Sequence, residues 1–254
     1  MGFPGNDSEY LVVRGEQRSR ERWGIPAESA LTLWLNGHQW ATLMCTPVAR
    51  KQLALGFAYF AGVVRSLDDV LLVEECPEDP TQLKLRLARD IEPPSRVIIT
   101  AGCGQGALVA YDGGLPRVPP APALSAAAIL DAMRSLHAGS ALHRSFGGTH
   151  ASALSDGHSL LALYEDVGRH NTVDKLMGHC LLTGLASSGG VLLTSGRLSS
   201  EMVHKAVGMQ VSAVISRSTP TDMALSLASG AGLAVYGYAR GQQLTVFCGE
   251  PPLP

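Results

Sequence analysis

The chain has 254 residues, which is long enough for one large α/β domain or two smaller ones with a substantial core. Hydrophobic residues make up 46% and charged residues only 17%, so the composition excludes a disordered chain. The formal net charge of -2 excludes a general attraction to nucleic acid or anionic lipid, so a phosphate-bearing partner must be held by a local site. Because neither a signal-peptide pattern nor an apolar run of about 18 residues is present, we expect a cytoplasmic protein with no membrane contact.

The first predicted elements are a loose start and a β-hairpin. Residues 1–30 are polar and rich in arginine, and we expect them to be loosely ordered at the beginning. The runs 30–34 (ALTLW) and 40–44 (WATLM) flank Asn36-Gly37, and an Asn-Gly pair between two such runs is a strong hairpin signal. The first regular structure is therefore expected to be β.

A helix and three strands are expected next. Pro47 favours a helix start, and apolar residues as far as Val64 form one broad face that is expected to be buried. Gly56 lies inside this helix, where a glycine suggests close packing. The following strands are expected at residues 70–73, 83–87 and 97–100.

A domain boundary is expected near the middle of the chain. Residues 110–124 are rich in Gly and Pro, which is typical of a linker or a mobile loop. We therefore expect a smaller N-terminal α/β domain in residues 1–115 and a second domain in residues 116–254.

In the second half, strands alternate with helices. This order predicts a mostly parallel sheet with helices on both faces, in which ligands bind beyond the carboxyl ends of the strands. Strands are expected at residues 151–154, 160–164, 191–194, 213–216, 233–238 and 244–247. Helices are expected at residues 125–138, with Ser125 as the cap, and at residues 172–183, 199–208 and 222–228.

The richest stretch of polar chemistry is residues 165–175 (EDVGRHNTVDK), between a predicted buried strand and a predicted helix. Acids, an imidazole, a guanidinium, an amide and a lysine occur together, and one glycine lets backbone N–H groups approach a ligand. This junction is a natural anion site. The alternative is purely structural, with Asp166 and Asn171 capping the chain and Arg169 and Asp174 forming a solvated pair.

Four other strand ends carry similar chemistry. Three of the five segments combine a small hydroxyl residue or glycine with an arginine, the residue types that bind phosphate oxygens. Their recurrence on one rim predicts a ligand with several phosphates, such as a nucleotide or dinucleotide. The alternative is that Ser195 and Ser199 cap helices and that the arginines form surface salt bridges. The four segments are residues 147–150, 194–201, 216–221 and 238–241.

Cys103 is the cysteine most suited to chemistry. It is flanked by Gly102 and Gly104, directly after a predicted buried strand and before the Gly- and Pro-rich segment. A thiol on such a pliable loop can attack or carry a group, whereas the alternative is a small buried apolar side chain. We interpret Cys45, Cys76 and Cys180 as small apolar packing residues.

Metal and hydrolase motifs are missing from the sequence. No Cys-x-x-Cys pair is present, and the His-x-Glu followed by Pro-Cys-x-x-Cys of zinc deaminases does not occur. A Gly-x-Ser-x-Gly elbow is also missing, which weakens a Ser–His–Asp hydrolase. We therefore expect no metal ligands.

Across roughly residues 30–247 the sequence resembles the formate dehydrogenase accessory sulfurtransferases of the FdhD type. The order and spacing of many short motifs carry the resemblance. These motifs are Thr46-Pro47, 53–57 (LALGF), 147–151 (GGTHA), 165–175, 195–197 (SGR) with 199–202 (SSEM), and 216–218 (SRS).

The resemblance implies a fold and a reaction. The second domain would have a three-layer, cytidine-deaminase-like α/β fold without zinc. Cys103 would accept persulfide sulfur from a cysteine desulfurase and transfer it to the molybdenum or tungsten bis-molybdopterin guanine dinucleotide cofactor of formate dehydrogenase. Many members carry a second cysteine three positions on, where this chain has Gly106; single-thiol transfer is unaffected by that difference.

The resemblance and the polar rim together give the expected cofactor-binding residues, with residues 240–248 as the nucleotide-contacting segment. The partners would be the desulfurase, the catalytic subunit of formate dehydrogenase and the guanine nucleotide moiety, and a homodimer is compatible with such a fold. The expected residues are Thr149, His150, Asp166, Gly168, Arg169, His170, Asn171, Ser195, Gly196, Arg197, Ser216, Arg217, Arg240, Gly241, Leu244, Thr245, Val246, Phe247 and Cys248.

Two other functions remain open at this point. The chain could be a non-enzymatic chaperone that binds the same cofactor and carries no sulfur. It could also be a nucleotide hydrolase that uses His170 and Asp166. Loss of maturation on Cys103→Ala favours transfer, and turnover of guanine nucleotides by the pure protein favours hydrolysis.

Overall fold

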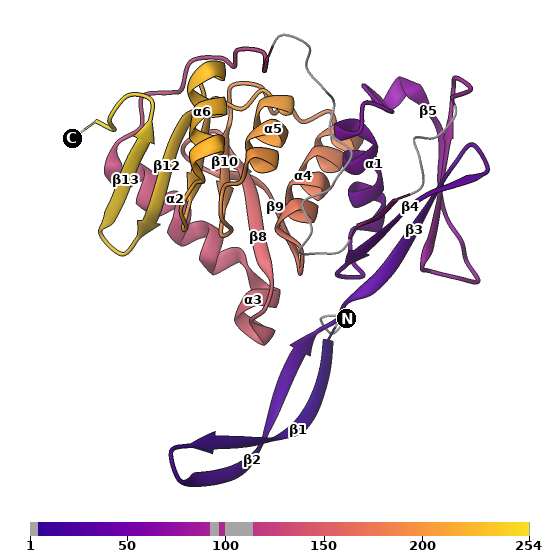
Figure 1. Cartoon of the computed structure of the whole chain (residues 1–254), viewed down its shortest axis with the longest axis horizontal. Coiled ribbons are helices and arrows are strands. Elements are labelled where there is room, and N and C mark those ends of the chain that lie inside the picture. Colours follow the sequence, from indigo (N-terminus) through magenta and orange to yellow (C-terminus); the bar gives the residue numbers. More distant parts are fainter. Residues whose placement is uncertain (1–4, 92–96, 100–113, 254) are drawn as a thin grey trace.

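The computed structural model describes residues 5–91, 97–99 and 114–253 (Figure 1). Cys103 therefore lies outside the described residues. The described strands form three sheets, of two, five and six strands. No helix in these ranges has both the length and the apolar character that crossing a membrane requires.

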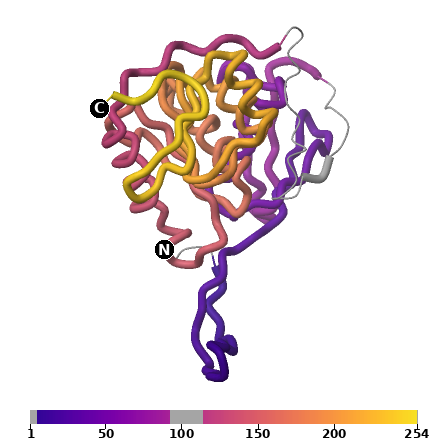
Figure 2. Tube along the Cα trace, turned by 60° about the vertical axis from the view of Figure 1, so that its left-hand side comes forward, coloured from indigo at the N-terminus to yellow at the C-terminus, as the bar shows by residue number. Residues whose placement is uncertain are grey.

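The polar N-terminal segment forms an antiparallel β-ribbon that extends away from the body, as Figures 1 and 2 show. Its strands are β1 (Gly5–Arg14) and β2 (Gln17–Pro26). The prediction of a loose start was wrong because many polar side chains of this segment are paired across the strands, which a composition argument does not detect. The cross-strand ion pairs join Arg14 to Glu21, Arg20 to Glu9 and Arg22 to Asp7.

The five-stranded sheet has the order β5-β6-β3-β4-β7. The hairpin predicted around Asn36-Gly37 is confirmed as the β3–β4 pair. In β6, Lys84 and Arg86 alternate with buried leucines and are exposed. The strands are β3 (Ser29–Leu35), β4 (His38–Cys45), β5 (Val70–Glu75), β6 (Gln82–Leu87) and β7 (Val97–Ile99), with a short 3-10 helix at Leu67–Asp69.

Helix α1 (Arg50–Phe60) packs its buried residues against one face of this sheet. It begins three residues later than predicted because Ala49 has a left-handed backbone conformation, with φ of 53°, and so ends the preceding turn. Val64 is buried but follows the helix.

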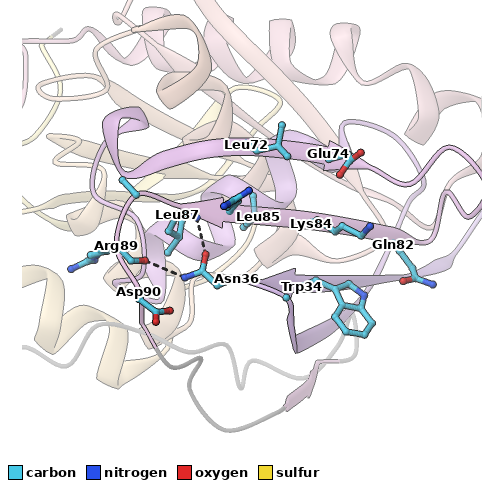
Figure 3. Close-up of a pocket in the computed structure, with 13 residues that line it drawn as sticks. Trp34, Asn36, Leu72, Glu74, Gln82, Lys84, Leu85, Leu87, Arg89 and Asp90 are labelled. Carbon is cyan, nitrogen blue, oxygen red and sulfur yellow. Dashed lines mark hydrogen bonds between the residues drawn. The ribbon is translucent and has the colours of Figure 1, made fainter.

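The opposite face of the five-stranded sheet borders a cavity of about 860 Å³ lined by residues that include Trp34, Leu72 and Lys84 (Figure 3). At one end of this cavity, the side chain of Asn36 makes two hydrogen bonds to the backbone. Its side-chain oxygen accepts a hydrogen bond from the backbone N–H of Leu87 at 2.9 Å, and its amide donates to the carbonyl of Arg89 at 3.1 Å (Figure 3). None of these residues was predicted to be functional.

The six-stranded sheet has the order β13-β12-β11-β10-β8-β9. Only the β10–β11 and β11–β12 pairs are parallel, so the prediction of a mostly parallel sheet was wrong. The segment between β8 and β9 is too short for a crossover helix and can only form a hairpin. The strands are β8 (His150–Ser155), β9 (Leu160–Asp166), β10 (Val191–Thr194), β11 (Ala213–Ser216), β12 (Ala234–Arg240) and β13 (Gln243–Cys248).

Helices cover both faces of this sheet, which confirms the expected three-layer α/β domain preceded by a smaller α/β domain. Helix α2 (Ala126–Gly139), capped by Ser125 as predicted, packs on one face. Helices α4 (Arg169–Thr183), α5 (Ser200–Gly208) and α6 (Asp222–Ala231) pack on the other. The short helix α3 (Ala141–Phe146) was not predicted. The domain boundary between residues 115 and 116 stays a prediction.

Helices α1 and α4 lie in backbone contact, which connects the two larger sheets. A Cβ atom on Gly56 would lie 1.8 Å from the carbonyl oxygen of Asp174, and one on Gly178 would lie 1.9 Å from that of Gln52. Only glycine fits at either position. The close packing suggested for Gly56 is confirmed, and it fixes the position of α4, whose first turn carries Arg169 and His170.

Candidate functional site

The five predicted polar segments meet at one edge of the six-stranded sheet. Strand β9 ends beside the start of β8, with His150 opposite Asp166. Strands β10 and β11 end together, with Thr194 opposite Ser216, and β12 runs parallel to β11. From β12 to β9 there are four strand-to-strand steps, so this edge spans about 19 Å at the usual spacing of about 4.8 Å. That span suits an extended ligand.

Asp166 is fully buried and all of its acceptor capacity is used. Its carboxylate accepts hydrogen bonds from the backbone N–H of Thr46 at 3.2 Å, from that of Gly168 at 2.9 Å and from the side-chain amide of Asn171 at 2.9 Å. It also pairs with the ammonium of Lys175 at 2.6 Å, and both side chains have 0% exposure. Asp166, Gly168 and Asn171 therefore shape the turn before α4.

The same cluster joins the two larger sheets. Asn171 donates a second hydrogen bond to the carbonyl of Met44 at 2.9 Å, at the end of β4. The hydroxyl oxygen of Thr46 accepts a hydrogen bond from the backbone N–H of Val167 at 3.1 Å. Lys175 also donates to the carbonyl of Glu165 at 3.1 Å. Sequence reasoning missed these roles of Lys175 and Thr46, although both stand within the motifs that it singled out.

Three segments of this edge carry buried polar atoms that have no hydrogen-bond partner within the described part of the chain. Such atoms are rare in folded proteins because each one costs desolvation free energy. Here they come from the start of β8, the first turn of α4 and the cap of α5, which is where a ligand was expected. The atoms are Thr149 Oγ1, Arg169 Nε, both ring nitrogens of His170, and Ser199 Oγ.

The charges around Arg169 and His170 favour the binding of an anion. Burial, together with the positive charges of Lys205 and Arg169, lowers the pKa of His170 to about 3. The ring is therefore neutral near pH 7, and its 3.4 Å contact with Glu201 is not an ion pair there. Burial and Arg169 also lower the pKa of His150. Arg169 supplies the positive charge while the imidazoles remain neutral.

Gly196 lets the β10 end pack closely against this group. A Cβ atom on it would lie 3.1 Å from Arg169 Cβ and 3.4 Å from His150 Nδ1. The hydroxyl of Ser216 donates to the Gly196 carbonyl at 2.7 Å, and the hydroxyl of Ser195 accepts the N–H of Ala151 at 3.0 Å. Ser195, Gly196 and Ser216 thus form the supporting floor of the edge.

The three predicted arginines of the rim are exposed. Arg197 lies three residues beyond the end of β10. Arg217 lies 3.5 Å from the Nδ1 of His137, on the α2 side of the sheet. The guanidinium of Arg240 lies 6.0 Å from the centre of the Tyr238 ring. All three can therefore reach a ligand on the surface.

The C-terminal segment divides into exposed and packed residues. Gly241 has φ of 61° in the tight turn between β12 and β13, and Thr245 and Val246 are exposed. The other three predicted residues pack partly into the core, with Leu244 on the α2 side and Phe247 and Cys248 on the α6 side.

Two further sequence expectations concern cysteines and metals. Cys45 and Cys180 are buried, as expected, and burial raises their pKa values to about 12 and about 11 respectively. Within residues 5–91, 97–99 and 114–253, no three His, Cys, Asp or Glu side chains gather as a metal site.

The low pKa of His170 predicts a pH dependence of stability. Between pH 6.5 and about 3 the unfolded chain binds a proton that the folded chain does not, so stability is lost as the pH falls through this range. Urea unfolding at about pH 7 and at about pH 5 measures how much stability is lost between the two pH values. This loss should be smaller for His170→Gln than for the wild type. His38→Gln, at an exposed position, is the control and should keep the wild-type slope. Equal slopes for His170→Gln and wild type would contradict the burial of a neutral ring.

Comparisons with known proteins cover nearly the whole chain. The model of the FdhD/NarQ family matches residues 26–252. The sulfur carrier protein FdhD of Bacillus subtilis is 33% identical over 87% of this chain and 86% of its own, and that of Variovorax paradoxus is 34% identical over 96% and 92%. The crystal structure of a protein from Desulfotalea psychrophila, described as a formate dehydrogenase accessory protein, has the same fold. Its TM-score is 0.78 at 24% identity, covering 96% of this chain and 97% of that one.

Proposed function

The chain belongs to the FdhD/NarQ family, and from this premise we propose that it is a cytoplasmic sulfur carrier for formate dehydrogenase. It accepts sulfur from a cysteine desulfurase on Cys103 and transfers it to the molybdenum or tungsten bis-molybdopterin guanine dinucleotide. The cofactor is the substrate of this sulfurtransferase, and the catalytic subunit of formate dehydrogenase receives the product. Relatives that are named sulfur carrier proteins support this proposal.

The observation that carries the proposal is the set of buried polar atoms at the sheet edge that have no hydrogen-bond partner in the part of the chain that the structure describes. A guanine dinucleotide presents phosphate oxygens, which accept hydrogen bonds, and the Arg169 Nε–H and the hydroxyls of Thr149 and Ser199 can donate them. The residues therefore fit the ligand. Arg197 and Arg217 would hold further phosphate oxygens from the surface.

The remaining residues act in two other ways. Asp166, Gly168 and Asn171 hold the turn that presents Arg169. The exposed part of the C-terminal segment would contact the guanine moiety, with Arg240 and Gly241 at the turn, while the packed residues of β13 keep that strand in place.

The sulfur is accepted by nucleophilic exchange. The Cys103 thiolate attacks the outer sulfur of the persulfide on the desulfurase, a new S–S bond forms, and the donor cysteine leaves as a thiolate. One S–S bond replaces another, so this step needs no oxidant. A persulfide is more acidic than a thiol and remains ionised near neutral pH, which keeps its outer sulfur ready for transfer.

Nucleotide binding by the full chain tests the site. We expect GDP to bind, and Arg169→Ala to weaken binding by about tenfold to a hundredfold, since a charge-assisted hydrogen bond is lost. Isothermal titration calorimetry measures both. Arg86→Ala is the matched control, because Arg86 is exposed on the other sheet. No GDP binding by the wild type, or equal effects of the two substitutions, would contradict this site.

A further inference from the structure

Helices α4 and α5 face each other through two polar contacts, which hold the ring of His170 in place. His170 and Asp174 lie four residues apart on α4 and therefore share one face of that helix. Glu201 and Lys205 share one face of α5 in the same way. The ammonium of Lys205 pairs with the Asp174 carboxylate, both side chains being at most 5% exposed, and lies 5.0 Å from the centre of the Phe60 ring. One turn nearer to the sheet edge, His170 Nε2 lies 3.4 Å from a carboxylate oxygen of Glu201.

The hydrogen-bonding capacity of His170 does not match a phosphate group. The ring is neutral near neutral pH, and a carboxylate only accepts hydrogen bonds, so the single N–H of the ring lies on Nε2, which faces Glu201. Nδ1 is therefore an acceptor, and it is buried with no hydrogen-bond partner among the residues that the structure describes. The ionised pyrophosphate of a dinucleotide only accepts hydrogen bonds as well. Nδ1 therefore suits a part of the ligand that carries an N–H group.

The dinucleotide carries N–H groups at both of its ends, on the guanine and on the pterin, and the fold separates the two. In the proposed function the guanine lies at the turn between β12 and β13, whereas α4 follows β9, at the other end of the sheet edge (Figure 1). Arg217 and Arg197 come after β11 and β10, which lie between these ends. A ligand with its guanine at the β12–β13 turn and its phosphates along the arginines therefore brings its pterin to His170.

The strand that leads to Cys103 supports the same orientation. Strand β7 precedes Cys103 in the sequence and ends at Ile99, opposite Leu43 of the parallel strand β4. The next residue of β4, Met44, accepts a hydrogen bond at 2.9 Å from the side chain of Asn171 in the first turn of α4. The end of β7 therefore lies near the α4 end of the sheet edge. Since the cofactor binds its metal through the pterin part, the sulfur is needed at this end of the ligand.

We propose, on the basis of the proposed function, that His170 recognises the pterin of the dinucleotide: Nδ1 accepts a hydrogen bond from a pterin N–H group, and the guanine lies at the opposite end of the edge. His170 is then a specificity-determining residue that distinguishes a pterin dinucleotide from a simple guanine nucleotide, while Arg169 binds phosphate. The contacts between α4 and α5 favour this role because an acceptor that is already fixed in place loses little conformational freedom on binding.

Two ligands that share a GDP group test this assignment in isothermal titration calorimetry with the full chain. They are GDP itself and the oxidised, metal-free pterin guanine dinucleotide, which adds a pterin with N–H groups. We expect the wild type to bind the dinucleotide about tenfold more tightly than GDP, and His170→Leu to reduce this ratio to about one while GDP affinity is unchanged. His170→Asn, whose side-chain oxygen can replace Nδ1 as an acceptor, should keep part of the ratio. The matched control is His179→Leu, on the same helix outside the candidate site, which should change neither affinity.

The affinity for GDP separates failure of this assignment from failure of the proposed function. Retained GDP binding shows that the His170→Leu chain is folded. Three results would overturn the assignment to the pterin: a wild-type ratio in His170→Leu, an equal loss of affinity for both ligands in that variant, or a wild type that binds GDP and gains nothing from the pterin. In each case the phosphate site would still be supported by GDP binding to the wild type. A wild type that binds neither ligand would contradict the proposed function and this assignment together.

Discussion

A Cys103→Ala chain is expected to bind GDP with wild-type affinity and to leave formate dehydrogenase inactive, with activity reduced by about a hundredfold or more. The nucleophile that accepts the sulfur is removed, while the phosphate-binding edge stays intact. Formate dehydrogenase activity in cells that depend on this chain for maturation is the measurement, alongside calorimetric GDP binding to the purified variant.

Cys76→Ala provides the comparison, since Cys76 is partly exposed and lies outside the candidate site. This variant should support full maturation. If Cys103→Ala also matures the enzyme fully, sulfur transfer through this residue is excluded and the chain acts only as a binding chaperone for the cofactor.

The largest effect on stability is expected at the buried ion pair between Lys175 and Asp166. Lys175→Met should lower the free energy of unfolding by about 3–5 kcal/mol, because the Asp166 carboxylate is left buried without its counter-charge. The reduced midpoint in urea unfolding measures this loss. Lys175 also donates to backbone carbonyls, so part of the loss comes from those acceptors.

A second substitution separates charge from packing. The double variant Lys175→Met/Asp166→Asn removes both charges and keeps two side chains of similar size, so it should recover part of the stability lost in Lys175→Met. A Lys175→Met chain that unfolds at the wild-type midpoint would show that this pair does not hold the domains together.

The sequence was most informative about the edge of the larger sheet. Strands β10 and β11 have the predicted bounds, because short apolar runs between polar turns leave little choice of register. The five polar segments meet as expected because β9, β10, β11 and β12 end at this edge and β8, which is antiparallel to β9 and β10, begins there. Placement could therefore be predicted even though the sheet is mixed.

The division of roles within the site could not be predicted. Asp166 and Arg169 belong to one polar stretch, yet the first is buried with four partners and the Nε of the second has no hydrogen-bond partner among the described residues. That difference depends on Lys175 and Thr46, and Thr46 lies 120 residues away from Asp166 in the chain. The N-terminal ribbon was missed for a similar reason, since its cross-strand ion pairs appear only once the register is known.

Mass spectrometry tests sulfur transfer most directly. The full chain is incubated with a cysteine desulfurase and cysteine, digested without a reducing agent, and examined at the peptide that contains Cys103. We predict that this peptide gains the mass of one sulfur atom and loses it again on treatment with a thiol. A Cys103 peptide of unchanged mass, under conditions in which the desulfurase is active, would contradict the proposed function.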